Sequence, residues 1–366
     1  MEEIVICANS YLQYKSALYI ATHNYQKRPI TILIPGNPDL FKFFNLINEK
    51  SFHNALKLIY FEPFHPDPRR ARASGLNKVV YVLSDIIRER RYLKEAFQKY
   101  LCGIEGCELY FLDRGPMQFS LAKKLSNRNR LVYISPYDTQ VAPRQYAPTN
   151  INYLARLIIF KLTYGCGIAL GKLPHRAEVF PHMSARFLEK EFRRVIDGEE
   201  RDEMMKGFEL SQFKVLDVSR YRVIYFFDDA SDYSGSEDAF RKELACIFDT
   251  LRKYFPESAI AYKYHPGYRR EGALTEIGDV LPDFIPAELL YDDNVKMYFG
   301  TCSAAMSNVE KGLVVSILDL ISFKNSEIRE RLKEILINMS RSEVLFPKSL
   351  DELEEILISL RSDERK

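Results

Sequence analysis

The chain has 366 residues, of which 46% are hydrophobic and 28% are charged, and its formal net charge is +2. This composition is typical of a folded globular protein and excludes a chain that is disordered throughout. A charge so close to balance argues against a dedicated nucleic-acid binder. The length exceeds what one hydrophobic core usually supports, so we predict two domains.

Short apolar runs alternate with helical patterns in the first part of the chain. Residues 4–8 form a continuously apolar run, as in a strand buried on both faces of a parallel sheet. Asn9 and Ser10 are suitable caps for a helix predicted over residues 11–22. Further strands are predicted at residues 29–34, 57–61, 108–112 and 131–134, and residues 79–88 are helical or a strand running into a helix. This alternation indicates βαβ units and a parallel sheet.

This alternation of strands and helices is not evident between about residues 150 and 219, where a charged, helix-like stretch covers residues 187–205. It then resumes with a strand at 221–227, a helix at about 237–254, strands ending at 264, 299 and 318, and an amphipathic helix at 349–360. We therefore predict a Rossmann-like N-terminal domain over residues 1–205, a Rossmann-like C-terminal domain over 206–345, and a closing helix within 346–366. No Gly-x-Gly-x-x-Gly or Walker loop is present. Two such α/β domains predict the GT-B glycosyltransferase architecture, whose substrates lie in a cleft between the domains.

The strand that ends at Tyr264 is followed directly by His265, Pro266 and Gly267. Pro266 lacks a backbone donor and Gly267 permits positive φ, so the strand must stop there. An imidazole is thereby placed at the carboxyl end of a strand, where open α/β sheets bind their ligands. Taken alone, the motif favours a plain strand end.

Three other short motifs also follow predicted strands or lie in short loops. Asp113 follows the strand at 108–112, and Glu288 follows Pro286 in a Pro-x-Glu segment. Gly300, Thr301 and Ser303 follow the strand ending at residue 299. Each motif has a structural interpretation as well: an Asp-x-Gly turn, a helix that starts at a proline, and an ordinary helix cap.

In this order, the four motifs resemble those of bacterial sialyltransferases of the polysialic-acid capsule and lipooligosaccharide type. Those families carry an Asp/Glu-Asp/Glu-Gly motif in the first domain, then His-Pro, Pro-x-Glu and Ser/Thr motifs in the second. The opening segment around Ser10 and Gln13 also resembles their first loop and helix. The chain departs from the pattern at Arg114, where the families usually have a second acid.

The resemblance implies an inverting transferase that moves sialic acid, or a related ulosonic acid, from a CMP-activated donor to a sugar hydroxyl of a bacterial surface glycan. Asp113 would take the proton from the acceptor hydroxyl, and His265 would stabilise the charge that develops on the departing phosphate. The donor-binding residues implied are Pro266, Glu288, Gly300, Thr301, Ser303, Ser10 and Gln13.

Paired acids at Asp228 and Asp229 raise the question of a divalent metal. A turn or capping role is favoured by the neighbouring serines and glycine. A monophosphate leaving group also needs no metal to bridge phosphates, so we predict neither a metal nor another cofactor.

Two alternative functions remain open from the sequence. One is a GT-B transferase that uses a UDP- or GDP-sugar. The other is a glycan-binding protein with a decayed site, which is suggested by Arg114 in place of the second acid of the motif. The basic clusters at residues 69–72 and 88–91 are either solvated surface or contacts for anionic lipid headgroups or an anionic glycan. Acidic Glu2 and Glu3 lead straight into a strand, and no run approaches about 20 apolar residues. We therefore expect a cytoplasmic protein without nucleic-acid partners, whose membrane contact is peripheral, on the inner face of the cell membrane.

Overall fold

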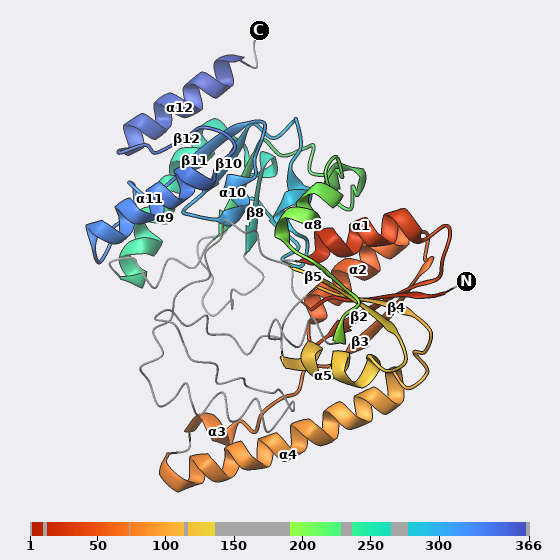
Figure 1. Ribbon diagram of the computed structural model, residues 1–366. Coiled ribbons are helices and arrows are strands. Elements are labelled where there is room, and N and C mark those ends of the chain that lie inside the picture. Colours follow the sequence, from red (N-terminus) through yellow and green to blue (C-terminus); the bar gives the residue numbers. More distant parts are fainter. Residues whose placement is uncertain are drawn as a thin grey trace. The chain divides into compact units, whose positions relative to one another are not determined.

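The computed structural model describes residues 2–9, 13–72, 74–112, 116–135, 191–227, 236–264 and 277–363. The chain divides into two compact units, Met1–Glu209 and Leu210–Lys366, whereas the sequence suggested a division after residue 205. Each unit contains one parallel six-stranded sheet (Figure 1). The strand orders are β3-β2-β1-β4-β5-β6 and β12-β11-β10-β7-β8-β9. Counted from the first strand of each unit, both are the doubly wound Rossmann order, which confirms the predicted GT-B fold class.

The first unit follows the alternating pattern expected from its sequence. Its elements are β1 (Ile4–Cys7), α1 (Tyr14–Asn24), β2 (Ile30–Pro35), α2 (Pro38–Ser51), β3 (Leu56–Phe61), α3 (Arg69–Arg72), α4 (Gly75–Tyr100), β4 (Glu108–Phe111), α5 (Pro116–Leu125), β5 (Arg130–Ile134), β6 (Arg194–Ile196) and α8 (Gly198–Met204). Strand β1 lies in the middle of the sheet and all four of its side chains are buried. That is the reason its sequence is apolar without alternation.

Helices cover both faces of the first sheet (Figure 1). Val5 and Cys7 point to the face where Leu121 and Leu125 of α5 complete the core. Helix α2 begins at Pro38, and the side chain of Asn37 caps it by accepting a hydrogen bond from the Leu40 amide at 2.9 Å. The sequence therefore specifies both the buried strand and the start of the helix.

The second unit repeats the arrangement. Its elements are η2 (Leu210–Gln212), β7 (Val223–Phe227), α9 (Glu237–Tyr254), η3 (Glu257–Ala259), β8 (Ile260–Tyr264), β9 (Asp279–Leu281), η4 (Ala287–Leu290), β10 (Met297–Gly300), α10 (Ala304–Ser307), β11 (Leu313–Ser316), α11 (Ser326–Met339), β12 (Val344–Leu345) and α12 (Leu350–Asp363). Leu353 and Leu357 of α12 are fully buried in the same core as α9. The Lys253 ammonium also pairs with Glu354 at 2.5 Å. The closing helix is thus an integral part of this unit.

Three sequence expectations differ from the structure in instructive ways. Residues 79–88 lie inside α4, which is much longer than predicted. The described end of the 187–205 stretch is not one helix, because it contains strand β6 before the short helix α8. Strands β9 and β12 were not predicted. All three of the unexpected strands have two or three residues and lie at or near a sheet edge, where no buried apolar run marks them.

Candidate functional site

Of the predicted site residues, Ser10, Gln13, Asp113, Gly300, Thr301 and Ser303 lie at or after strands at which a sheet reverses its order, whereas His265 and Pro266 follow β8 and Glu288 follows β9. In the first unit these neighbouring strands are β1 and β4, and in the second they are β7 and β10. Ligands of doubly wound sheets bind outside the carboxyl ends of such strands, because the adjoining loops diverge there and leave a crevice. Gln13 comes from the segment after β1, whereas Gly300 is the last residue of β10.

Several of the predicted residues lie outside the described residues. They are Ser10, Asp113, His265 and Pro266, together with Arg114 and the acidic pair Asp228 and Asp229. The strands before them are as expected, since β4 ends at Phe111 and β8 ends at Tyr264. The meeting of the Asp113 carboxylate with the His265 imidazole stays a prediction.

Gln13 is almost fully buried just before α1, with 2% of its surface exposed. It occupies the cap position of that helix but makes no capping hydrogen bond, and its Oε1 atom has no partner among the described residues. The Oδ1 atom of Asn9, two residues after the end of β1, is likewise buried and has no partner among the described residues. Buried acceptors without donors are costly, so these two oxygens are candidates for binding a ligand hydroxyl or amine.

The predicted residues at the end of β10 and just after it differ in their local structural roles. A Cβ atom on Gly300 would lie 2.8 Å from the Phe226 carbonyl oxygen and 2.9 Å from Met306 Sδ, so strand packing by itself requires glycine here. Thr301 is fully buried, and its Oγ1 atom has no partner among the described residues. Ser303 is half-buried and caps α10 by accepting from the Ala305 amide at 3.4 Å, as the cap interpretation predicted. Of the two hydroxyls, only that of Ser303 belongs to a partly exposed residue.

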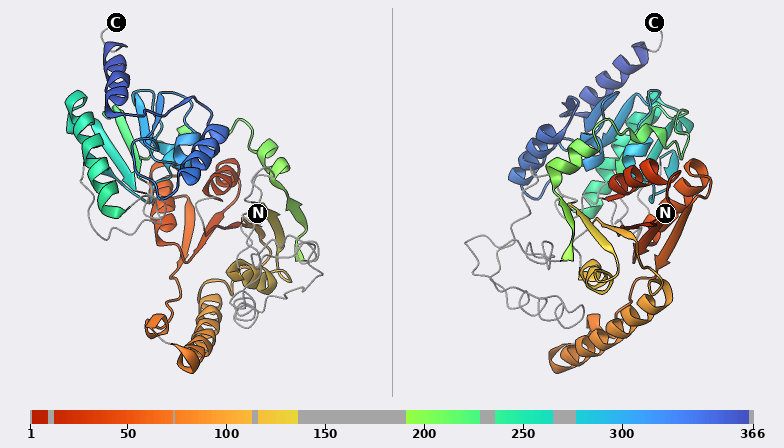
Figure 2. Two further views of the ribbon diagram at one scale, coloured as in Figure 1. Left: turned by 90° about the vertical axis from the view of Figure 1, so that its left-hand side faces the viewer. Right: turned by 45° about the vertical axis from the view of Figure 1, so that its right-hand side comes forward.

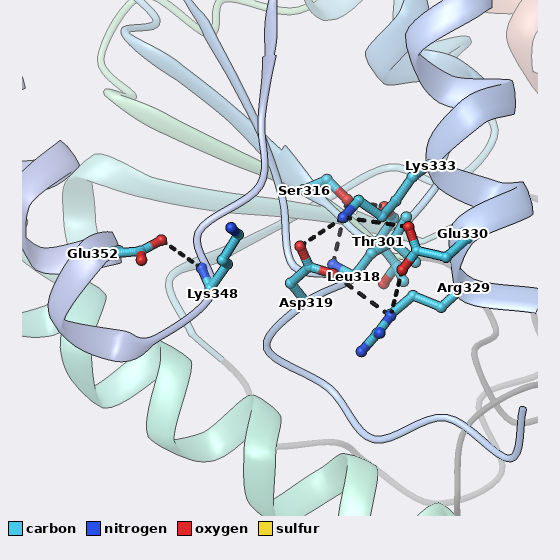
Figure 3. A network of polar contacts seen from close by, with 9 residues as sticks. All are labelled: Thr301, Ser316, Leu318, Asp319, Arg329, Glu330, Lys333, Lys348 and Glu352. Atoms are coloured by element: carbon cyan, nitrogen blue, oxygen red, sulfur yellow. Dashed lines mark hydrogen bonds and ion pairs between the residues drawn. The ribbon is translucent and has the colours of Figure 1, made fainter. Parts of the chain in front are cut away.

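A polar network fastens this segment to its neighbours (Figure 3). The Ser316 hydroxyl, at the end of β11, donates to the Thr301 carbonyl at 2.6 Å. The Asp319 carboxylate follows in the same loop and accepts from Lys333 Nζ of α11 at 2.8 Å. Sequence reasoning assigned Ser316 and Asp319 no role, although a serine within an apolar run and an acid just after it were visible signals. The network holds the ends of β10 and β11 in fixed positions.

Glu288 lies half-buried in η4, the short 3-10 helix that follows Pro286. The helix-start interpretation of this segment is therefore correct locally. The same element is connected to the segment after β10, because the Tyr291 hydroxyl donates to the Ala305 carbonyl. Burial, and then the negative charge of Glu288, raise the pKa of Tyr291, so its hydroxyl stays protonated as a donor.

Lys263 is a buried cation that the sequence analysis did not single out. It lies in β8, two positions before His265, with 4% of its surface exposed. Its Nζ atom donates to the carbonyls of Tyr264 at 3.0 Å and Asp283 at 3.2 Å. Burial lowers the pKa of Lys263 to about 8, although the charges of Asp283 and Glu288 oppose that shift. Lys263 and Glu288 are thus close enough to interact electrostatically across the end of β8.

No known protein family matches the chain, and no curated protein matches it. Among solved structures, the chain is similar to the glycotransferase of kitacinnamycin, with 11% identity and a TM-score of 0.42, covering 99% of this chain and 91% of that one. It is also similar to Arabidopsis thaliana UGT89C1 complexed with UDP-L-rhamnose, with 10% identity, a TM-score of 0.41, and coverage of 100% and 93%. A UDP-glucosyltransferase from Polygonum tinctorium is similar at 11% identity, with a TM-score of 0.37 and 98% of each chain covered. Likeness at this level concerns the fold and not the substrate.

Proposed function

We propose that the protein is a glycosyltransferase that binds a nucleotide-sugar donor on its second unit. The observation that carries the proposal is the convergence of three segments at the carboxyl end of that unit's sheet. Lys263 near the end of β8 interacts electrostatically with Glu288 of η4, and Tyr291 connects η4 to the segment that holds Ser303. A buried cation, a half-buried carboxylate and a hydroxyl at the carboxyl end of a Rossmann-like sheet are suited to a nucleotide with its ribose and phosphate.

The proposed chemistry assigns a role to each group. An acceptor hydroxyl oxygen attacks the anomeric carbon, the bond from that carbon to the phosphate oxygen breaks, and Asp113 takes the hydroxyl proton. His265 and the Ser303 hydroxyl stabilise the charge that gathers on the departing phosphate. Glu288 accepts hydrogen bonds from the ribose hydroxyls. Attack from the face opposite the leaving group inverts the anomeric centre.

The proposed donor is a nucleotide sugar. A further question is which nucleotide the donor carries. The motif order favours CMP-sialic acid or a related CMP-ulosonate, with a lipooligosaccharide or capsule glycan as acceptor. The alternative is a UDP- or GDP-sugar. Two of the similar structures named above are a complex with UDP-L-rhamnose and a UDP-glucosyltransferase, which supports this alternative. The roles of Glu288 and Ser303 are the same for either donor.

The decisive experiment measures release of free nucleotide from a panel of activated sugars. Purified full-length protein is incubated with CMP-sialic acid, UDP-sugars and GDP-sugars, each with a panel of glycan acceptors. We expect acceptor-dependent release of CMP. Release of UDP or GDP without CMP would establish the alternative donor. No release from any donor, together with no thermal stabilisation by any nucleotide, would contradict the proposal and favour a glycan-binding protein.

A further inference from the structure

The long helix α4 exposes a stripe of large apolar side chains. Val80 and Ile87 are each 63% exposed and Leu83 is 50% exposed. Their spacing places all three on one face of the helix. Val195 is the one other large apolar residue exposed in the described part of the first unit. Apolar side chains gathered on one face indicate an interaction surface more strongly than scattered ones.

The opposite face of α4 is already used for packing. Ile86, Leu93 and Ala96 are buried, and the Tyr92 hydroxyl donates to the Glu62 carbonyl. Figures 1 and 2 show α4, in orange, reaching beyond the edge of the first unit's sheet. The helix is therefore fixed by one face, and the exposed stripe is its second, separate face.

Basic residues continue this stripe along the helix. Arg90, Arg91 and Lys94 are exposed and lie on the same face as Val80 and Ile87, and they form no ion pair among the described residues. From residue 69 to residue 100 the chain has nine basic and three acidic residues. One of the three acids, Asp85, is buried and pairs with Arg88 at 3.3 Å. The exposed face thus has a strong positive charge next to apolar side chains.

Helix α11 shows that apolar exposure alone does not produce this combination. It exposes Ile335, Ile337 and Met339 by 40 to 55%. Its sequence, however, holds three basic and three acidic residues. Two of its cations, Arg329 and Lys333, are paired with carboxylates. The positive charge, and not the apolar exposure, distinguishes α4.

We propose that the exposed face of α4 binds the surface of an anionic lipid bilayer. Val80, Leu83 and Ile87 would enter the boundary between headgroups and acyl chains, while Arg90, Arg91 and Lys94 contact lipid phosphates. Charge complementarity favours anionic lipid over a neutral partner. A helix with apolar and basic side chains on one face binds in the plane of the membrane surface. None of the helices in the described residues is long and apolar enough to cross a membrane. The inference does not depend on which donor the protein uses.

The test is co-sedimentation of the full chain with vesicles of phosphatidylcholine alone or mixed with phosphatidylglycerol. We expect binding to the mixed vesicles that weakens as salt is raised, because screening acts on exposed charges. Replacing Arg90, Arg91 and Lys94 together by glutamine should weaken binding by about a hundredfold, since each basic residue near an anionic surface contributes about fivefold. The double variant L83S/I87S should weaken it by about tenfold.

The matched control is I335S/I337S on α11, which should bind the mixed vesicles like the native protein. All these side chains are exposed, so the variants should keep the native circular dichroism spectrum and melting temperature. Equal binding to both vesicle compositions, or no binding to either, would overturn the proposal. So would a lipid-free dimer that L83S/I87S dissociates, because the stripe would then bind a second copy. Capture of a soluble acidic glycan without vesicle binding would overturn it as well.

Discussion

The two units share one strand order but differ sharply in charge. The first unit, residues 1–209, has 31 basic and 22 acidic residues, whereas the second, residues 210–366, has 21 basic and 28 acidic. The near-neutral total therefore conceals net charges of +9 and −7. Topology follows from buried apolar strands, which both units have, and it leaves surface charge free to diverge. The positive charge of the first unit fits the anionic surface proposed for it, whereas the donor proposed for the second unit depends on particular side chains and not on net charge.

The strongest test of this division of labour is Asp113→Asn in the first unit. Loss of the proposed general base should lower kcat by about a thousandfold, since proton transfer contributes up to four orders of magnitude. The dissociation constant for the donor nucleotide should not change, because the proposed nucleotide site is on the second unit. Steady-state transfer assays measure kcat, and nucleotide titration measures the dissociation constant. A variant that transfers at the native rate would remove Asp113 from the mechanism.

Two glycines, one in each unit, allow the steric constraints on the two backbones to be compared. Gly278 and Gly207 both have positive φ, at 71° and 76°. A Cβ atom on Gly278 would lie 2.0 Å from the Ile260 carbonyl oxygen, whereas one on Gly207 meets nothing within 4 Å. We expect Gly278→Ala to lower the free energy of unfolding by about 3 kcal/mol or more and Gly207→Ala by about 1 kcal/mol. Equal losses in denaturant titrations would mean that Gly278 is not in close contact with β8.

His265→Ala tests the second unit's part in the reaction. Loss of a group that stabilises charge on the leaving phosphate should lower kcat by about a hundredfold. The effect should be smaller than that of Asp113→Asn, because the Ser303 hydroxyl remains. Replacing Ser303 by alanine in the same variant should lower the rate further. Single-turnover kinetics with saturating donor isolate this step, and an unchanged rate would exclude His265 from charge stabilisation.

Lys263 gives the second unit a pH dependence of stability. Its pKa is lowered by burial to about 8, below its ordinary value of 10.5. Above pH 8 the folded protein therefore loses this proton while the unfolded chain keeps it, so the free energy of unfolding rises with pH. We expect a gain of about 2 kcal/mol between pH 8 and 10 relative to Lys263→Met, which lacks the titrating group. The free energy of unfolding is measured by urea titration at each pH. If it changed with pH equally in the two proteins, the pKa of Lys263 would not be lowered.

Much of the fold is predictable because the pattern of apolar residues along one strand or helix indicates which of its side chains are buried. The apolar runs located β1, β2, β3, β4, β5, β7, β8, β10 and β11, and the limits of α9 agree with the helix predicted at 237–254. Among the site motifs in the described residues, Gly300 ends β10 as predicted, whereas Glu288 lies in η4 and not at a strand end. Short edge strands such as β6 and β12 were missed, because so few residues do not show a period.

The sequence by itself determined two Rossmann-like domains, the positions of their main strands and the order of the polar motifs after them. Tertiary structure alone decided that Lys263 is buried and donates to the Asp283 carbonyl, that Ser316 donates to the Thr301 carbonyl, and that one face of α4 stays exposed. The physical reason is the range of the interactions. Periodicity and capping act within a few residues, whereas these contacts depend on which strands become neighbours in the sheet.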